Sequence, residues 1–401
     1  MMKTFLSTFV ILLLAAGCTG NRDADDFIRD NIRHAVAHHT RQTDGIEASG
    51  SILNPRTTRE DGSVVYIPIE DWTSGFFPGS MWLTYELTGD RKWKTLAEKY
   101  TEALDSVKYL TWHHDVGFMI GCSYLNGYYR AGKHEYREVI IQAARSLCTR
   151  FRPAAGVIQS WDVDKGWQAE RGWKCPVIID NMMNLELLFE ASILSGDPSY
   201  GQIAVEHANT TLNHQFREDH SSFHVIDYDP ETGAVRHKHT AQGYAHESAW
   251  ARGQAWGLYG YVTCYRYKRD PRYLEQAQKI HDFIFSHPRL PEDLVPYWDY
   301  DVPEIPDTPR DASAAACTAA ALYELHTYLP EHGYKATADR IMRNLASPDY
   351  RAEIGENGNF ILKHSVGSIP HGVEIDVPLN YADYYFLEAL IRKRDLEKER
   401  L

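Results

Sequence analysis

At residues 88–93 the sequence reads Thr-Gly-Asp-Arg-Lys-Trp, which joins a helix-stop signal to a helix-start signal. Glycine suits the position just after a helix end because it adopts a left-handed backbone without steric cost, and aspartate suits the N-cap of the next helix. The pattern recurs at 131–136 and 195–200, and more weakly at 269–273 and 330–334. A repeated stop–start signal predicts a chain built from helical hairpins.

Two kinds of segment alternate around these signals. After each signal, apolar residues recur at helical spacing, as Trp93, Leu96, Ala97 and Tyr100 do, which predicts an amphipathic helix. Before each signal, the residues are apolar or small nearly all round, which predicts a helix buried on every side. The buried helices are expected at 76–88, 117–131, 180–195, 246–267, 310–329 and 380–393.

One more amphipathic segment, which contains Phe27 and Ile28, precedes the first buried helix. The pattern is then six outer helices alternating with six inner ones, with short strand signals only at 64–67 and 223–226. Because one hairpin cannot bury its own apolar faces, the repeats are expected to close on each other. We therefore predict an all-α fold, an (α/α)6 barrel.

The N-terminus has the features of a targeting segment. Lys3 precedes the apolar run 5–14, which is too short to span a bilayer as a helix. The run ends in Leu-Ala-Ala-Gly-Cys at 14–18, which resembles a bacterial lipobox; an ordinary signal peptide cut nearby is the alternative. We expect a lipidated Cys18 and a protein held at the bacterial cell envelope, facing the periplasm.

These features divide the chain into three parts. Residues 1–17 are predicted to be the lipoprotein signal peptide, 18–25 a short tether and 26–401 a single catalytic barrel domain. Five further cysteines lie in the predicted domain, without a Cys-x-x-Cys pair, and are expected to be free thiols in an apolar setting. They are Cys122, Cys148, Cys175, Cys264 and Cys317.

The formal net charge of −13 argues against nucleic acid or a long polyanion as a partner. A small acidic ligand in a locally basic pocket remains compatible with it. The only membrane contact expected is the N-terminal lipid anchor.

Polar residues gather just before, or in the first turns of, the predicted inner helices. In an (α/α)6 barrel all inner helices run the same way, so these residues should meet at one mouth, where helix N-termini favour anions. The clusters are 71–76, 113–118, 180–184, 242–244, 246–256, 310–311 and 381–384.

Two carboxylates in these clusters are candidates for acid–base catalysis. Asp180 follows an Ile-Ile pair and precedes a Met-rich buried segment, and Asp115 lies between two histidines and a Gly-Phe turn. Helix capping is the alternative role of each. Two carboxyl groups in one apolar mouth raise a pKa, which keeps one of them protonated and able to donate.

Metal and cofactor chemistry is not expected. The candidate ligands lack the spacing of a zinc site, since the sequence has neither His-Glu-x-x-His nor Cys-x-x-Cys, and Gly-x-Ser-x-Gly is missing as well. The basic run 236–239 is expected to be a solvated loop that could attract an acidic sugar. The candidate ligands are His113, His114, Asp115, His237, His239 and His246.

The polar clusters together resemble the unsaturated glucuronyl hydrolases, glycoside hydrolase family 88. The resemblance covers nearly all of the chain after residue 25, and its family fold is the (α/α)6 barrel. The motifs that carry it are 71–79, 114–118, 180–184, 242–244 and 250–256.

This resemblance implies roles for the site residues. Asp180 is expected to be the general acid and base, and Asp115 the second carboxylate, which orients the substrate. We expect Arg252 to contact the uronate carboxylate or to keep the surroundings of Asp180 positive; a structural ion pair with Glu247 or Asp383 is the alternative. The expected sugar-binding residues are Trp72, His224, Gln242, Trp250, Arg252, Trp256, Ser365, Ser368 and Tyr381.

The chain departs from the family at one stretch. Members that favour sulfated sugars can carry Ser-x-x-Ser-x-Lys, whereas this chain keeps Ser365 and Ser368 but has Pro370 in place of the lysine. The preference for sulfate therefore stays open.

The family chemistry implies hydration of a C4=C5 double bond left by a polysaccharide lyase, with release of unsaturated glucuronic acid and without a cofactor. Three alternatives stay open. They are an unsaturated rhamnogalacturonyl hydrolase acting on pectin fragments, a sugar epimerase that uses a histidine pair, and a non-catalytic glycan-binding lipoprotein.

Overall fold

The computed structural model describes the backbone of residues 11–398 and the side chains of 24–398. The side chain of Cys18 and most of the predicted signal peptide therefore lie outside the described residues. No helix in the described part of the chain is both long and apolar enough to cross a membrane.

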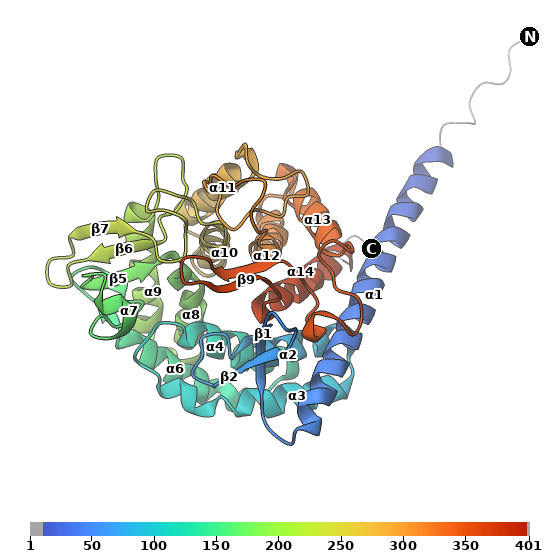
Figure 1. Ribbon diagram of the computed structural model, residues 1–401, viewed down its shortest axis with the longest axis horizontal. Coiled ribbons are helices and arrows are strands. Elements are labelled where there is room, and N and C mark those ends of the chain that lie inside the picture. The colour runs from blue at the N-terminus through green and yellow to red at the C-terminus, as the bar shows by residue number, and fades with distance from the viewer. Residues whose placement is uncertain (1–10, 399–401) are drawn as a thin grey trace, which may run out of the picture.

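The helices form two concentric rings, as predicted (Figure 1). Contacts run around the inner ring from α2 through α14, α12, α10, α8 and α4, and residues 121–131, which continue α4, contact α2 again, so the barrel is closed. The inner helices are α2 (Phe76–Thr88), the broken helix α4 (Val116–Ile120) with α5 (Asn126–Ala131), α8 (Leu185–Ser195), α10 (Ala251–Lys268), α12 (Ala312–Tyr328) and α14 (Asn380–Lys398). The outer helices are α1 (Ile11–Ala48), α3 (Arg91–Glu102), α6 (Arg137–Cys148), α9 (Pro198–His214), α11 (Pro271–Ser286) and α13 (Tyr334–Leu345).

The stop–start signals form the helix ends that the sequence predicts. Gly89 ends α2 with a φ of 69°, and the Asp90 carboxylate accepts the backbone N–H of Lys92 at the start of α3. Asp197 and Asp270 cap α9 and α11 in the same way. Such a cap contributes about 1 kcal/mol to helix stability, because it satisfies a backbone donor that the helix leaves free.

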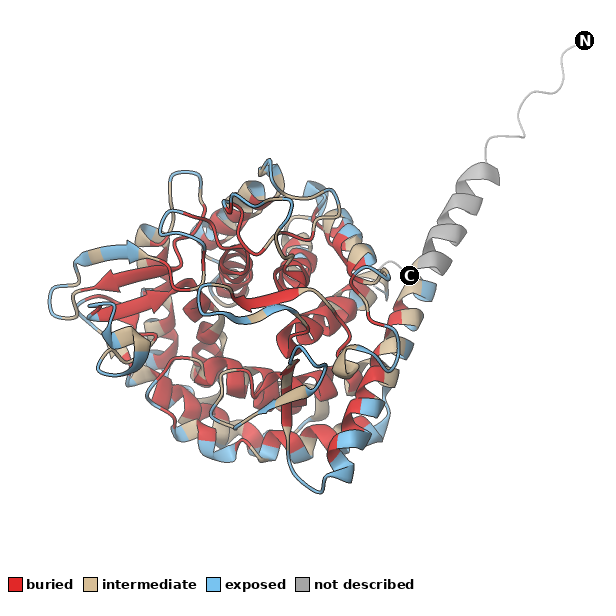
Figure 2. Ribbon diagram, viewed as in Figure 1, coloured by how far each residue is buried: buried red, intermediate tan, exposed pale blue. Residues whose placement is uncertain are grey.

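The burial pattern separates the two rings (Figure 2). Helix α12 is buried along nearly its whole length, whereas α3 buries only the stripe around Trp93 and Tyr100. The inner segments approach each other so closely that a Cβ on Gly117 would lie 2.3 Å from the Asn184 side chain. All five described cysteines are free thiols, as expected.

Some inner segments begin later or less regularly than predicted. The segment expected at 246–267 becomes helical only at Ala251, because Trp250 forms an isolated β-bridge with Asp299. The segment expected at 117–131 is interrupted by a π-helical turn, Gly121–Leu125, and Asp180 lies in a 3₁₀ turn, Ile179–Asn184, before α8.

The described chain also contains more strand than the two signals indicated. Its nine short strands form four small antiparallel sheets, and β9 crosses in front of the centre of the barrel (Figure 1). The strands are β1 (Asn54–Thr58), β2 (Val64–Ile67), β3 (Phe151–Arg152), β4 (Val157–Ile158), β5 (Cys175–Ile178), β6 (Val225–Tyr228), β7 (Val235–His239), β8 (Ser365–Ser368) and β9 (Val373–Val377). Most are too short for an alternating pattern to be visible in the sequence.

Candidate active site

A cavity of about 120 Å³ lies where the inner helices begin. Asp115 is the N-cap residue of α4, Asp180 lies in the 3₁₀ turn before α8, and Arg252 and Tyr381 lie in the first turns of α10 and α14. The polar clusters of the sequence thus meet at one mouth, as predicted. The expected residues that line the cavity are Trp72, Asp115, Asp180, Gln242, Arg252, Ser368 and Tyr381.

Asp180 is a carboxyl group of the cavity whose pKa is raised. Burial, reinforced by the negative charge of Asp115 and opposed by the positive charge of Arg252, raises the pKa of Asp180 to about 7. Its Oδ2 is buried and has no hydrogen-bond partner among the described residues. Neither Asp180 nor Asp115 uses its side chain to cap a helix, so capping, the alternative role, does not account for them.

The pKa of Asp115 is shifted in the opposite direction. Its carboxylate oxygens lie 3.3 Å from His113 Nδ1 and 3.3 Å from His114 Nε2. Burial alone would raise the pKa of Asp115, but His114 and His113 outweigh it and hold the pKa below its usual value. Two carboxyl groups whose pKa values move apart in one cavity suit an acid and an ionised partner.

His224 lies behind Asp180 and does not line the cavity. Its Nδ1 accepts the backbone N–H groups of Ala241 and Gln242 at 3.0 and 3.1 Å, which leaves the proton of the neutral ring on Nε2. Burial and then the charge of Arg252 hold the pKa of His224 well below its usual value. The buried ring therefore presents a neutral donor toward Asp180.

Arg252 is bound by partners that the sequence did not indicate. It forms an ion pair with Asp311 at 2.9 Å, donates to the carbonyls of Val366 and Gly367, and its Nε has no partner among the described residues. The alternative expectation, an ion pair of Arg252 with Glu247 or Asp383, is therefore wrong. Glu247 lies 3.6 Å from Arg217, and the Asp383 carboxylate accepts backbone N–H groups at 361 and 362.

Trp250, the N-cap residue of α10, and Trp256, within the helix, were expected to bind the sugar but do not line the cavity. The Arg252 guanidinium lies 4.6 Å from the centre of the Trp250 ring, so the two side chains pack against each other. Trp256 is completely buried, and the indole N–H groups of Trp250 and Trp256 have no partner in the described part of the chain.

The β8–β9 hairpin covers one side of the cavity. Gln242 Nε2 donates to the Gly367 carbonyl at 3.2 Å, and Ser368 Oγ lies 2.7 Å from His371 Nδ1. Ser365 is buried away from the cavity and does not line it. Pro370, which replaces the family lysine, is exposed and carries no charge.

Among the charged and aromatic residues that line the cavity, the sequence did not indicate Arg56, Glu374 and Trp161. The Arg56 guanidinium donates to Glu374 at 2.7 Å and to Asp71 at 2.8 Å, which ties β1 to β9 across the mouth. Arg56 and Glu374 are 318 positions apart, so no local pattern could pair them. Of the three residues in this contact, only Asp71 belongs to a motif recognised in the sequence, the one that also contains Trp72.

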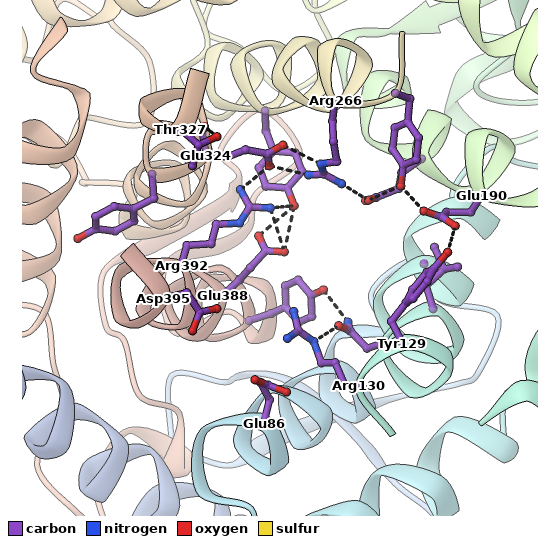
Figure 3. A pocket seen from close by; sticks show the side chains of 18 of the residues that line it. Glu86, Tyr129, Arg130, Glu190, Arg266, Glu324, Thr327, Glu388, Arg392 and Asp395 are labelled. Atoms are coloured by element: carbon purple, nitrogen blue, oxygen red, sulfur yellow. Dashed lines mark hydrogen bonds and ion pairs between the residues drawn. The ribbon is translucent and has the colours of Figure 1, made fainter. Parts of the chain in front are cut away.

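A larger cavity, of about 700 Å³, lies where the inner helices end (Figure 3). Its charged groups bind one another: Arg266 and Arg392 both pair with Glu324, and Arg392 also reaches Glu388 at 3.4 Å. Glu190 accepts hydrogen bonds from Tyr129 and a second tyrosine. This mouth thus carries a satisfied polar network, whereas the smaller cavity leaves an Asp180 oxygen unbound.

The histidines outside the cavity form a stack. The ring centres of His237 and His239 are 5.0 Å apart, and those of His239 and His246 are 4.3 Å apart. Within residues 24–398 no group of three or more His, Cys, Asp or Glu side chains is arranged to hold a metal ion.

Known proteins resemble this chain over most of its length. The chain is 49% identical over 344 residues to the unsaturated glucuronyl hydrolase of Formosa agariphila, which covers 85% of each chain. It is 37% identical to the unsaturated chondroitin disaccharide hydrolase of Streptococcus agalactiae, over 80% of this chain and 81% of that one.

The solved structure of an unsaturated glucuronyl hydrolase specific for heparin superposes with a TM-score of 0.88. It is 45% identical and covers 93% of this chain and 98% of its own. The Bacillus sp. GL1 enzyme superposes with a TM-score of 0.81 at 31% identity. The model of Glycosyl Hydrolase Family 88 matches residues 50–394. The chain therefore belongs to Glycosyl Hydrolase Family 88 and is a glycoside hydrolase.

Proposed function

We propose that this enzyme releases 4,5-unsaturated glucuronic acid from the non-reducing end of lyase-generated glycosaminoglycan oligosaccharides. The observation that carries the proposal is the Asp180 carboxyl group, which has a pKa raised to about 7 and a free Oδ2 in a cavity with basic side chains. Relatives named for unsaturated glucuronyl and chondroitin disaccharide substrates support the same class.

The chemistry that suits this site is hydration of the C4=C5 double bond. Protonated Asp180 donates its proton to C4, and positive charge develops at C5 and the ring oxygen. Water then adds at C5 and returns a proton to the Asp180 carboxylate. The resulting hemiketal opens, and the bond to the leaving sugar breaks. One acid–base group suffices for these reaction steps.

The remaining side chains would hold the sugar and set the charge of Asp180. Asp115, ionised between His113 and His114, favours the protonated form of Asp180 by like-charge repulsion. Arg252 contributes positive charge to the cavity wall, where the uronate carboxylate would lie, although its donors are largely taken by Asp311 and the hairpin carbonyls.

The proposal is tested with unsaturated disaccharides from chondroitin, hyaluronan, heparin and pectin. We expect turnover of at least one glycosaminoglycan disaccharide and little turnover of the pectin fragment. Turnover of the pectin fragment alone would support the rhamnogalacturonyl alternative. Binding without turnover of any disaccharide would support a glycan-binding lipoprotein.

We also propose that the enzyme is a lipoprotein of the cell envelope that faces the periplasm. Residues 1–17 would be removed, Cys18 would carry the lipid, 18–25 would form the tether and 26–401 the single catalytic domain; the run at 14–18 supports this. Cys18→Ala, expressed in a bacterium, is expected to move from the membrane to the soluble fraction. Membrane association that persists in this variant would contradict the proposal.

A further inference from the structure

The size of the catalytic cavity leaves the second sugar of a substrate outside it. Pockets that enclose a drug-sized ligand are about 300–1,000 Å³, whereas this cavity is about 120 Å³. It holds one sugar ring at most. The sugar that follows the unsaturated uronate must therefore lie across the rim, and the residues of the rim decide which substituents on that sugar are accepted.

One side of the rim is built from three tryptophans, which we call the tryptophan rim: Trp161, Trp167 and Trp173. Trp161 lines the cavity, and its ring centre lies 5.0 Å from that of Trp167 and 6.0 Å from that of Trp173. The rim is therefore continuous with the wall of the cavity. Its half-buried Trp161 and Trp167 offer flat apolar faces of the kind that pack against sugars, whereas Trp173 is buried.

Arg171 places a positive charge on this rim. Its guanidinium carbon lies 5.7 Å from the centre of the Trp167 ring and 5.5 Å from that of Trp173. The side chain is exposed, and no described carboxylate lies within 4.0 Å of it, in contrast to Arg56 in the cavity wall, which Asp71 and Glu374 neutralise. The donors of Arg171 are thus available to an anion.

His371 joins the rim to the hairpin that covers the cavity. Its ring centre lies 5.0 Å from that of Trp167, and its Nδ1 lies 2.7 Å from Ser368 Oγ, a residue that lines the cavity. Burial and then the positive charge of Arg171 lower the pKa of His371. His371 therefore connects the tryptophan rim to Ser368 in the cavity wall, although the sequence places Arg171 and His371 200 positions apart.

We propose that Arg171, held on the tryptophan rim, binds a sulfate ester on the sugar that follows the unsaturated uronate. Arginine suits this task because its planar donors form paired hydrogen bonds with tetrahedral oxyanions. Stacking on two indoles fixes the guanidinium while leaving its edge free. The inference rests on the proposed function, because it takes the cavity to hold the uronate.

Arg171→Gln tests the proposal, with Arg269→Gln as a matched control. Arg269 is also exposed and stacked on two aromatic rings, those of Tyr265 and Tyr328, but it lies just beyond the far end of α10. We measure kcat/KM for a sulfated and an unsulfated disaccharide of the same linkage. Loss of one charge-assisted hydrogen bond at an exposed site predicts a roughly 5- to 10-fold fall.

We expect that fall for the sulfated disaccharide in Arg171→Gln alone, and a change of less than about twofold for the unsulfated one. The activity of the wild-type enzyme on the sulfated disaccharide should also decline as the salt concentration increases, because ions screen an exposed contact. Equal effects of Arg171→Gln on both disaccharides, or no effect on either, would overturn the proposal.

A binding measurement separates this inference from the proposed function. N-acetylglucosamine 6-sulfate is titrated against tryptophan fluorescence in wild type, Arg171→Gln and Arg269→Gln, with unsulfated N-acetylglucosamine as the comparison. We expect a saturable change with the sulfated sugar that is lost only in Arg171→Gln. If wild type turns over no disaccharide, the proposed function fails, while the titration still decides whether Arg171 binds sulfate.

Discussion

Asp180 Oδ2 lies 3.7 Å from His224 Nε2, and neither atom has a hydrogen-bond partner among the described residues. A buried polar group without a partner costs about 1–3 kcal/mol, so two such atoms facing each other are a costly arrangement. The cost is explained if a substrate or water atom completes the contact during the reaction. This arrangement motivates the predictions for Asp180→Asn and for the pH profile.

Asp180→Asn should abolish most activity and leave the fold intact. The amide keeps the shape of the side chain but has no proton to give, so kcat is expected to fall by roughly 10²–10⁴. The measurement is turnover of an unsaturated disaccharide together with Tm at pH 8. Because Asp180 Oδ2 accepts no hydrogen bond from the described residues, the Tm should stay the same or rise.

Asp383→Asn is the matched control for this variant. Burial likewise raises the pKa of Asp383 to about 7, and it lies in the first turn of an inner helix, but its oxygens accept the backbone N–H groups of Ile361 and Leu362 at 2.8 Å. An amide accepts only one of these bonds, so stability should fall by about 1–3 kcal/mol. Asp180→Asn within tenfold of wild-type turnover would contradict the assignment.

The pH dependence should be bell-shaped. Asp180 acts as an acid only while protonated, and its pKa is raised to about 7, so kcat/KM should fall as pH rises through about 7. Asp115 has a pKa held below its usual value, so its ionised form is lost only in strong acid, which sets the other limb. A pH profile of wild type tests this. Activity that rises steadily from pH 6 to 9 would exclude Asp180 as the acid.

Arg252→Lys should lower stability as well as substrate affinity. A lysine has one ammonium group and cannot reach Asp311 and the carbonyls of Val366 and Gly367 together. Weakening a completely buried ion pair predicts a loss of up to about 3–5 kcal/mol. KM should rise too, because the hairpin that covers the cavity loses its anchor.

Urea unfolding and steady-state kinetics of Arg252→Lys measure both effects. The contacts of Arg252 with Asp311 and with the hairpin carbonyls favour comparable effects on KM and on stability. A large rise in KM at unchanged stability would show that the guanidinium serves the substrate and not the hairpin.

Glu324→Gln should affect stability and not activity. Burial would raise the pKa of Glu324, but Arg266 and Arg392 outweigh it and lower the pKa to about 2. A lowered carboxyl pKa stabilises the fold above the unfolded-state pKa, and this stabilisation is lost as pH falls toward 2. The variant should therefore lose about 3–5 kcal/mol at pH 7 and less at pH 3.

Unfolding of wild type and Glu324→Gln at the two pH values checks the sign. Glu324 lines the cavity at the ends of the inner helices (Figure 3), whereas Asp180 lines the one where they begin, so kcat at 25 °C is expected to stay within about twofold. Equal stability of the two proteins at pH 7 would show that the network at this mouth does not support the barrel.

The fold was predictable because its signals are local. Gly89 and Asp90 carry the end of one helix and the start of the next within two residues, and the same is true of Asp197 and Asp270. The meeting of Asp115 and Asp180 followed from the common direction of the inner helices.

The contacts across the mouth were not predictable in this way. Arg252 pairs with Asp311, 59 positions away, and Arg56 with Glu374, 318 positions away. These pairs depend on how the β8–β9 hairpin packs over the barrel, and the spacing of residues in the sequence does not predict that packing. Trp161 and Arg171 were missed for the same reason, since an isolated aromatic or basic residue in a loop gives no spacing to interpret.

The last prediction distinguishes hydration from ordinary glycoside hydrolysis. Two carboxyl groups in one cavity also suit an inverting or retaining glycosidase, in which an acid protonates the leaving oxygen and water or a carboxylate attacks C1. Such an enzyme requires only the C1 linkage and would cleave saturated glucuronides. Hydration requires the C4=C5 enol ether, because protonation at C4 creates the cation that water traps.

The two mechanisms therefore differ in substrate and in the position of a new proton. We expect the enzyme to cleave an unsaturated disaccharide and to leave the matching saturated glucuronide untouched. In D₂O the product should carry deuterium at C4, measured by NMR early enough to precede exchange through spontaneous enolisation. Asp180→Asn should lose both the cleavage and the label. Comparable cleavage of the saturated glucuronide, without early deuterium at C4, would show that Asp180 protonates the leaving oxygen instead.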